Sequence, residues 1–256
     1  KNEFAEFTGP VVATTNCVLI PREEYKDRLF SMRVTAVPGC TVIKDDDFSA
    51  VIECAKKSVP LKENVIKEST IGFHHSVLLD AAGAIVEAVK AGKLAHFFVI
   101  GGCDGAEIGR NYFSDYAKAT PETSLILTLG CGKYRIRDND YGTFELDGVG
   151  EIPRLLDMGQ CNNAYGAIRV AVALAQAFKC GVNDLPLTIV LSWFEQKAVA
   201  VLLTLLSLGV KGIRIGPKPP AFVSPAVFEY LQKNFDLKLT GGAPLSDLQE
   251  ALRKAA

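Results

Sequence analysis

The chain has 256 residues, and its 28 basic and 29 acidic side chains give no reason to expect nucleic acid or an anionic membrane as a partner. This length is sufficient for one large α/β domain, or for one domain with part of another. The longest apolar helical stretch, residues 198–210, is too short to cross a bilayer, and no signal peptide is visible. Seven cysteines without a secretory signal favour a reducing cytoplasm, where thiols serve metal or redox chemistry.

The first part of the chain predicts a small α/β unit. Strands are expected at residues 11–15 and 33–37, and a helix at 48–57. A polar connector at residues 58–69 follows this helix. The connector predicts a domain boundary, so residues 1–70 and 71–256 are expected to form separate domains.

The remaining residues alternate between strand and helix patterns. Strands are expected at 96–100, 125–129, 187–191 and 213–215; helices at 78–91, 107–118, about 161–178, 195–208, 227–234 and 245–254. The helix at 195–208 is expected to be buried nearly all round, and the polar stretch 138–150 to form a loop or hairpin. Strand–helix–strand order predicts right-handed parallel crossovers. The expected fold is therefore a three-layer α/β fold, Rossmann-like, with a mainly parallel sheet and helices on both faces.

Four of the expected strands are followed by a cysteine or a carboxylate. These residues are Cys17, Cys103, Cys131 and Glu195, and a further thiol, Cys161, begins the helix that ends near residue 178. The carboxyl ends of parallel strands meet at one edge of a sheet, where α/β folds bind ligands. We therefore expect this edge to hold metal. The spacings match no zinc finger, but thiols that are scattered in sequence and converge at strand ends suit an iron–sulfur cluster.

Each of these residues also has a structural interpretation. Buried cysteines are common in ordinary cores, and Cys40 and Cys180, which lie beside glycines, are expected to be structural. The pair His74-His75 is more often solvated or hydrogen-bonded than a ligand set. Glu195 lies between aromatic residues and an apolar helix, where burial without a cation or a hydrogen-bonding partner is costly. The alternative function is that of a non-catalytic, thiol-rich α/β domain that binds a partner or a nucleotide.

Five ordered motifs resemble the hybrid-cluster protein family, also called prismane protein or hydroxylamine reductase, which is related to the nickel carbon monoxide dehydrogenases. The motifs are Thr14-Thr15-Asn16-Cys17, Gly101-Gly102-Cys103-Asp104-Gly105, Cys131-Gly132-Lys133-Tyr134-Arg135, Gly159-Gln160-Cys161-Asn162 and Leu191-Ser192-Trp193-Phe194-Glu195-Gln196-Lys197. The resemblance extends over essentially all 256 residues.

The resemblance implies an oxidoreductase that reduces hydroxylamine to ammonia and water, or a related N–O species such as nitric oxide. Its cofactor would be a hybrid 4Fe-2S-2O iron–sulfur–oxygen cluster, with ligands matched by Cys17, Cys103, Cys131, Cys161 and Glu195. Cys103 matches a cysteine that carries a persulfide, and Lys197 a lysine that lines the substrate pocket. Glu195, Lys197 and Cys103 are therefore the expected catalytic residues, and the expected partners are a small N–O substrate and an electron-donor protein.

The sequence also departs from the family pattern. It has no counterpart of the family's amino-terminal helical domain, which carries a second, ordinary 4Fe-4S cluster, or of the segment that supplies a histidine and a further glutamate to the hybrid cluster. His74 and His75 do not occupy that histidine's place. We therefore expect a carboxyl-terminal fragment that is inactive in isolation. Residues 1–70 would be the tail of a middle α/β domain, and 71–256 the last α/β domain.

Overall fold

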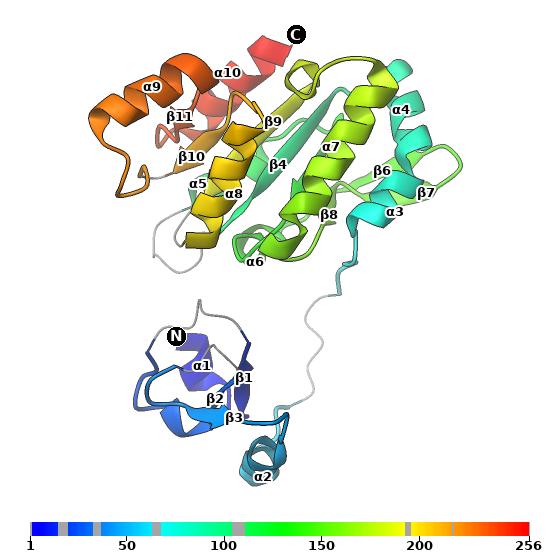
Figure 1. Cartoon of the computed structure of the whole chain (residues 1–256). Helices are drawn as coiled ribbons and strands as arrows, with labels where there is room; N and C mark the ends of the chain where they lie inside the picture. The colour runs from blue at the N-terminus through cyan, green and yellow to red at the C-terminus, as the bar shows by residue number, and fades with distance from the viewer. Residues whose placement is uncertain are drawn as a thin grey trace. The chain divides into compact units, whose positions relative to one another are not determined.

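The chain folds into two compact units, Lys1–Glu68 and Ser69–Ala256 (Figure 1). The structure, a computed structural model, describes residues 2–14, 20–32, 37–62, 68–103, 111–192, 196–216 and 218–255. Within these ranges, no helix has both the length and the apolar character that a bilayer crossing requires.

The first unit contains a three-stranded parallel sheet in the order β1-β2-β3, together with the α-helices α1 and α2. The elements are α1 (Asn2–Glu6), β1 (Val11–Ala13), β2 (Leu29–Met32), β3 (Thr41–Ile43) and α2 (Ser49–Lys57). Cys40 packs against the small core around Tyr25 and Leu29, as expected for a structural cysteine. Most of the strand expected at 33–37 lies outside the described residues. β2 and β3 were not predicted.

The second unit is built on a six-stranded sheet in the order β11-β10-β9-β4-β5-β8, in which every neighbouring pair is parallel. The strands are β4 (His96–Gly102), β5 (Ser124–Thr128), β8 (Leu155–Asp157), β9 (Leu187–Ser192), β10 (Arg214–Gly216) and β11 (Lys238–Leu239). Continuous apolar runs in β4, β5 and β9 are typical of strands covered on both faces. The prediction of an α/β fold with a mainly parallel sheet is confirmed.

Helices cover both faces of this sheet (Figure 1). They are α3 (His75–Asp80), α4 (Ala82–Lys90), α5 (Tyr112–Lys118), α6 (Lys133–Ile136), α7 (Ala164–Phe178), α8 (Gln196–Ser207), α9 (Pro225–Phe235) and α10 (Pro244–Ala255). Successive side chains of β4 point to opposite faces. Phe97 belongs to the core under α4 and α7, whereas Phe98 belongs to the core under α5 and α10. The unit therefore has three layers.

Several elements differ from the sequence-based expectation. The helix expected at 78–91 is two helices, α3 and α4, which meet at Ala81. The helix α8 is not buried all round, since Leu203 within it is 49% exposed and Leu208, which directly follows it, is 59% exposed. By contrast, the stretch 138–150 forms part of an antiparallel hairpin between β6 (Thr143–Leu146) and β7 (Gly150–Pro153), in agreement with the loop or hairpin expected there. The short elements α6, β8 and β11 were not predicted.

Candidate functional site

Three of the five expected ligands lie in the described part of the chain, and all three lie at the carboxyl edge of the six-stranded sheet. Cys103 directly follows β4, and Cys131 follows β5, which pairs with β4. Cys161 begins a 3-10 helix, Cys161–Asn163, that leads into α7. Cys17 and Glu195 lie outside the described residues.

Backbone hydrogen bonds join the turns that carry Cys103 and Cys131. The amide of Gly132 donates to the carbonyl of Gly102 at 2.8 Å, and the amide of Gly102 donates to the carbonyl of Leu129 at 3.0 Å. The residue before Cys103 is thus bonded to residues on both sides of Cys131. The two cysteines lie at one sheet edge and not on opposite faces of the unit.

The turn that carries Cys161 packs against the backbone of the Cys103 and Cys131 turns. Gly130 has a φ of +82°, and a Cβ atom there would lie 3.2 Å from Cys161 Sγ and 2.7 Å from the carbonyl oxygen of Gly102. The Gly130 amide also donates to the carbonyl of Gly159 at 3.0 Å. The Cys161 sulfur therefore lies over the backbone next to Cys131, at a position that only glycine suits.

The end of β9 meets the same edge. The amide of Cys103 donates to the carbonyl of Ser192 at 3.2 Å, and the Ser192 hydroxyl donates to the carbonyl of Gly101 at 3.2 Å. Residues 193–195 come next in the chain, followed by α8, whose second residue is the half-buried Lys197. The strand end that leads toward Glu195 is therefore bonded directly to Cys103.

A buried ion pair adjoins the thiol turns, and the sequence analysis did not identify it. Lys133 Nζ lies 2.8 Å from Asp157 Oδ1, and each side chain is 7% exposed. Lys133 belongs to a motif already noted for Cys131, but its charge gives no indication of its partner. The sequence feature that could have indicated a buried charge is Asp157, which directly follows two leucines just before the Cys161 motif.

His75 has a structural role beside the Cys161 turn. Its Nδ1 atom lies 3.0 Å from Asn163 Oδ1, and Asn163 Nδ2 donates to the carbonyl of Met158 at 2.6 Å. A Cβ atom at Gly166 would lie 2.2 Å from Asn163 Oδ1, so α7 needs glycine there. These contacts agree with the expectation that the histidine pair is hydrogen-bonded within the protein.

The donor set at this edge suits a sulfur-rich metal centre. Among the described side chains, no three histidines, cysteines or carboxylates are arranged to hold a metal ion, and Cys17 and Glu195 are not among these side chains. Three thiols at one edge, reached from different strands, are the soft donors that iron–sulfur clusters require. The chemistry of these donors therefore fits such a group.

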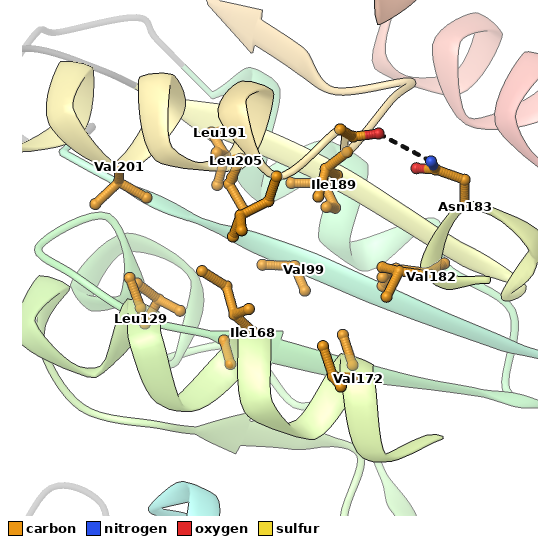
Figure 2. A pocket seen from close by; sticks show the side chains of 17 residues that line it. Val99, Leu129, Ile168, Val172, Val182, Asn183, Ile189, Leu191, Val201 and Leu205 are labelled. Carbon is orange, nitrogen blue, oxygen red and sulfur yellow. Dashed lines mark hydrogen bonds between the residues drawn. The ribbon is translucent and has the colours of Figure 1, made fainter. Parts of the chain in front are cut away.

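An apolar cavity of about 320 Å³ lies between α7 and α8, over β4 and β9 (Figure 2). The residues that line it include Val99, Leu129, Ile168, Ile189, Val201 and Leu205. Asn183 is the polar exception among the described lining residues, and its Nδ2 atom donates to the carbonyl of Gly209 at 2.9 Å (Figure 2). The cavity therefore offers almost no hydrogen-bonding groups to a molecule inside it.

A second cavity, of about 40 Å³, lies at the thiol edge and shares lining residues with the first. Leu129 and Leu191 line both cavities. The smaller cavity is also lined by Gly102, Cys161 and Ser192. The apolar interior of the helix layer thus extends up to the place where the cysteine turns meet.

A parallel α/β sheet with several thiols at its carboxyl edge, and apolar cavities under the helices beside them, is typical of cysteine-ligated metalloprotein domains. Comparison with known sequences agrees with this class. The chain belongs to the Prismane/CO dehydrogenase family, whose sequence profile matches residues 1–247. The resemblance to hybrid-cluster proteins is therefore confirmed.

Sequence relatives agree with this family, and a solved structure shares the fold. The chain is 56% identical to a hydroxylamine reductase from Moorella thermoacetica, over 98% of this chain and 58% of that protein. It is 52% identical to a hydroxylamine reductase from Zymomonas mobilis, over 100% of this chain and 46% of that protein. A carbon monoxide dehydrogenase from Thermococcus sp. AM4 shares the fold, with a TM-score of 0.71 at 17% identity over 94% of this chain and 45% of that one. The chain thus spans about half the length of these curated relatives.

Proposed function

We propose that this chain is the carboxyl-terminal part of an iron–sulfur oxidoreductase that reduces hydroxylamine to ammonia and water, or a related N–O species such as nitric oxide. The observation that carries the proposal is the convergence of the Cys103, Cys131 and Cys161 turns at one sheet edge. The hydroxylamine reductases at 56% and 52% identity support the choice of substrate.

The proposed cofactor is a hybrid 4Fe-2S-2O cluster. The residues proposed to hold it are Cys17, Cys103, Cys131, Cys161 and Glu195. When bound, the cluster would supply the two electrons that cleavage of the N–O bond requires. We place a second, ordinary iron–sulfur cluster and the contact with the electron-donor protein outside this chain.

The reaction needs a supply of protons, because each hydroxylamine consumes two protons and two electrons as it becomes ammonia and water. We assign one transfer to Lys197, whose ammonium would donate to the departing oxygen. Its position in the first turn of α8, just after the strand end bonded to Cys103, supports this role. Glu195, which lies between Ser192 and Lys197, would supply a carboxylate ligand that can swing aside to admit substrate.

The apolar cavity between α7 and α8 supports a small neutral substrate. A charged molecule would lose its hydration on entering a space with so few polar groups, which is costly. Neutral hydroxylamine and nitric oxide lose far less hydration. The cavity therefore favours these species over an anion such as nitrite.

The test uses the full-length protein, purified without oxygen. We expect it to contain iron and labile sulfide and to reduce hydroxylamine. Glu195→Gln should alter the cluster spectrum and suppress turnover, whereas Lys197→Ala should keep the spectrum and slow turnover by about 10²- to 10⁴-fold, as for a lost proton donor. Lys90→Ala, at an exposed lysine of α4, is the matched control.

Two outcomes would contradict the proposal. A folded protein that binds neither iron nor sulfide would instead support a non-catalytic thiol-rich domain that binds a partner or a nucleotide. Wild-type turnover in Glu195→Gln or in Lys197→Ala would remove that residue from the mechanism.

A further inference from the structure

The ion pair between Lys133 and Asp157 is buried where a pair of charges contributes little to stability. The two side chains are each 7% exposed, and their charged atoms lie 2.8 Å apart. Replacing such a pair with apolar residues of similar size is often neutral or stabilising, because desolvation offsets the attraction between the charges. Its position suggests a different role, since Lys133 lies two residues after Cys131 and Asp157 four residues before Cys161.

Further hydrogen bonds join the ion pair to both thiol turns. Asp157 Oδ1 also accepts from the amide of Gly159 at 2.8 Å. The carbonyl of Gly159 accepts from the amide of Gly130 at 3.0 Å, and Gly130 precedes Cys131. Lys133, Asp157, Gly159 and Gly130 thus form a closed ring of contacts that includes Cys131.

The turns inside this ring contain glycines, which restrict the backbone least. Gly130 and Gly159 have φ values of +82° and +102°, conformations that glycine adopts easily and also leaves easily. β8, which ends in Asp157, has three residues and lies at the edge of the sheet. Elements this short do not by themselves fix two sulfur atoms to the precision that a shared ligand requires.

We infer that Lys133 and Asp157 are positioning residues that fix the spacing between the sulfurs of Cys131 and Cys161. The inference rests on the proposed function in one respect, namely that the ligand shared by the two sulfurs is an iron–sulfur cluster. Neither residue is assigned a contact with substrate. Each acts through the turn that carries a thiol.

The test needs no cluster, because trivalent arsenic bridges two thiols that are close together. Phenylarsine oxide condenses with two thiols to give a cyclic dithioarsinite and one water, with no change in oxidation state. We would add it to the reduced, cluster-free 256-residue chain. Mass spectrometry of the peptides would identify the bridged cysteines, and titration would give the affinity of the Cys131–Cys161 bridge.

The informative variant is the double substitution Lys133→Met with Asp157→Leu. It removes both charges together, so no unpaired charge remains buried and the thermal unfolding midpoint should stay near that of the wild type. The affinity of the Cys131–Cys161 bridge should fall by about 10- to 100-fold, the range seen when groups that support metal ligands are lost. The single substitution Lys133→Arg keeps a cation beside Asp157. In this variant the affinity of the Cys131–Cys161 bridge should stay near the wild-type value.

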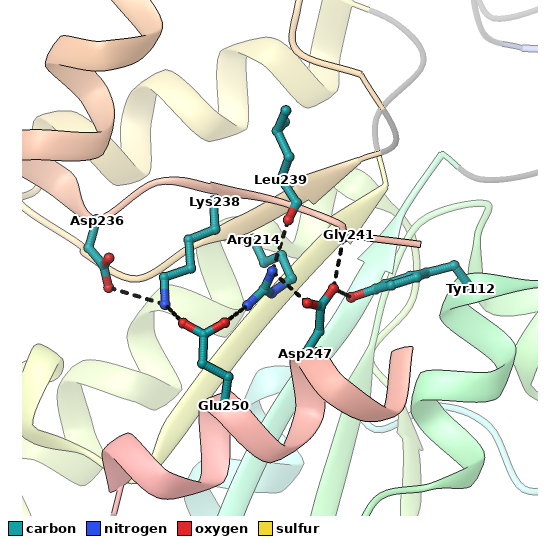
Figure 3. Close-up of polar contacts among 8 residues, drawn as sticks. All are labelled: Tyr112, Arg214, Asp236, Lys238, Leu239, Gly241, Asp247 and Glu250. Carbon is teal, nitrogen blue, oxygen red and sulfur yellow. Dashed lines mark hydrogen bonds and ion pairs between the residues drawn. The ribbon is translucent and has the colours of Figure 1, made fainter. Parts of the chain in front are cut away.

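A second buried ion pair in the same unit provides the matched control. Arg214 Nη1 lies 3.1 Å from Asp247 Oδ1, with side chains 8% and 12% exposed (Figure 3). The pair joins β10 to α10 and belongs to a network with Glu250, Lys238 and the hydroxyl of Tyr112 (Figure 3). Arg214→Met with Asp247→Leu should leave the Cys131–Cys161 bridge unchanged.

Three results would overturn the inference. They are wild-type bridging in the folded Lys133/Asp157 double variant, an equal loss of bridging in the Arg214/Asp247 control, and no Cys131–Cys161 bridge in the wild type. If bridging behaves as expected but the full-length protein holds no iron or sulfide, the proposed function fails and the positioning role stands.

Discussion

His96 shows how burial sets the charge of a single side chain. It begins β4, at the edge of the sheet opposite the thiols, and is 4% exposed. Its Nε2 atom lies 2.9 Å from the hydroxyl of Thr188, and its ring packs on Phe98 with centroids 4.5 Å apart. Burial lowers the pKa of His96 to about 4, so the imidazole is neutral at physiological pH.

This lowered pKa predicts a loss of stability in mild acid. Between the unfolded-state pKa of about 6.5 and the folded-state pKa of about 4, the unfolded chain binds a proton that the native state excludes. The free energy of unfolding should therefore fall by up to about 3 kcal/mol as the pH drops through this window. Urea denaturation at pH 7.5 and 4.5 should show a smaller fall for His96→Gln than for the wild type. An equal fall would show that His96 is not the group responsible.

At the scale of single residues, the sequence predicted which residues follow strands. It did not predict which residues they contact. Cys103 and Cys131 were placed at strand ends because buried strands are continuous apolar runs. The partners of Lys133 and Asp157 depend on how β5 and β8 pair, which no local pattern contains. The roles of the expected ligands and catalytic residues stay predictions; these residues are Cys17, Cys103, Cys131, Cys161, Glu195 and Lys197.

At the scale of elements, α7 and α8 form the walls of the apolar cavity, and α7 offers a matched pair of alanines. Ala171 lines the cavity, whereas Ala177 is exposed. Ala171→Leu should fill part of the space and raise the free energy of unfolding by about 1 kcal/mol, as cavity filling commonly does. Ala177→Leu should change it little.

The same pair tests whether the cavity serves as a substrate route. In the full-length enzyme, Ala171→Leu should raise the KM for hydroxylamine, whereas Ala177→Leu should not. Thermal unfolding and steady-state kinetics measure the two effects. A destabilised Ala171→Leu variant would indicate a site that is already well packed.

Most of the elements that the sequence analysis missed are short, whereas the long ones were predicted. The long helix α7 and the strands β4 and β9 were predicted because their patterns extend over several residues. The break between α3 and α4 falls at an alanine, Ala81, and a single glycine near it, Gly83, is not enough to predict a break in an apolar helical pattern. The exposure of Leu203 and Leu208 was not foreseen either, because an apolar face does not reveal whether another element covers it.

At the scale of the whole molecule, the alternation of strands and helices predicted a parallel α/β sheet, but not the order of its strands. β4 lies between β9 and β5, an order set by how the helices pack on the two faces. The assignment of residues 1–70 to the tail of a middle domain stays a prediction.

The chain spans about half the length of its curated relatives, and this bears on how much of the cluster it can hold by itself. The family resemblance implies a histidine and a further glutamate as cluster ligands, and we propose that both lie outside these 256 residues. We therefore expect the 256-residue chain by itself to hold no complete cluster, since metal affinity depends on a full, preorganised ligand set. The measurement is the iron and labile sulfide content of the 256-residue chain, compared with that of the full-length protein. A full complement in the chain alone would contradict the expectation.

The Lys133–Asp157 contact also bears on the order of folding. It closes a loop of 24 residues, whereas the Ser192–Gly101 hydrogen bond at the β9–β4 junction closes one of 91. The entropy of loop closure makes the shorter loop less costly by about 1 kcal/mol. The Cys131–Cys161 half of the thiol edge can therefore assemble as a local nucleus, while the arrival of β9 beside Cys103 is the slower, non-local step.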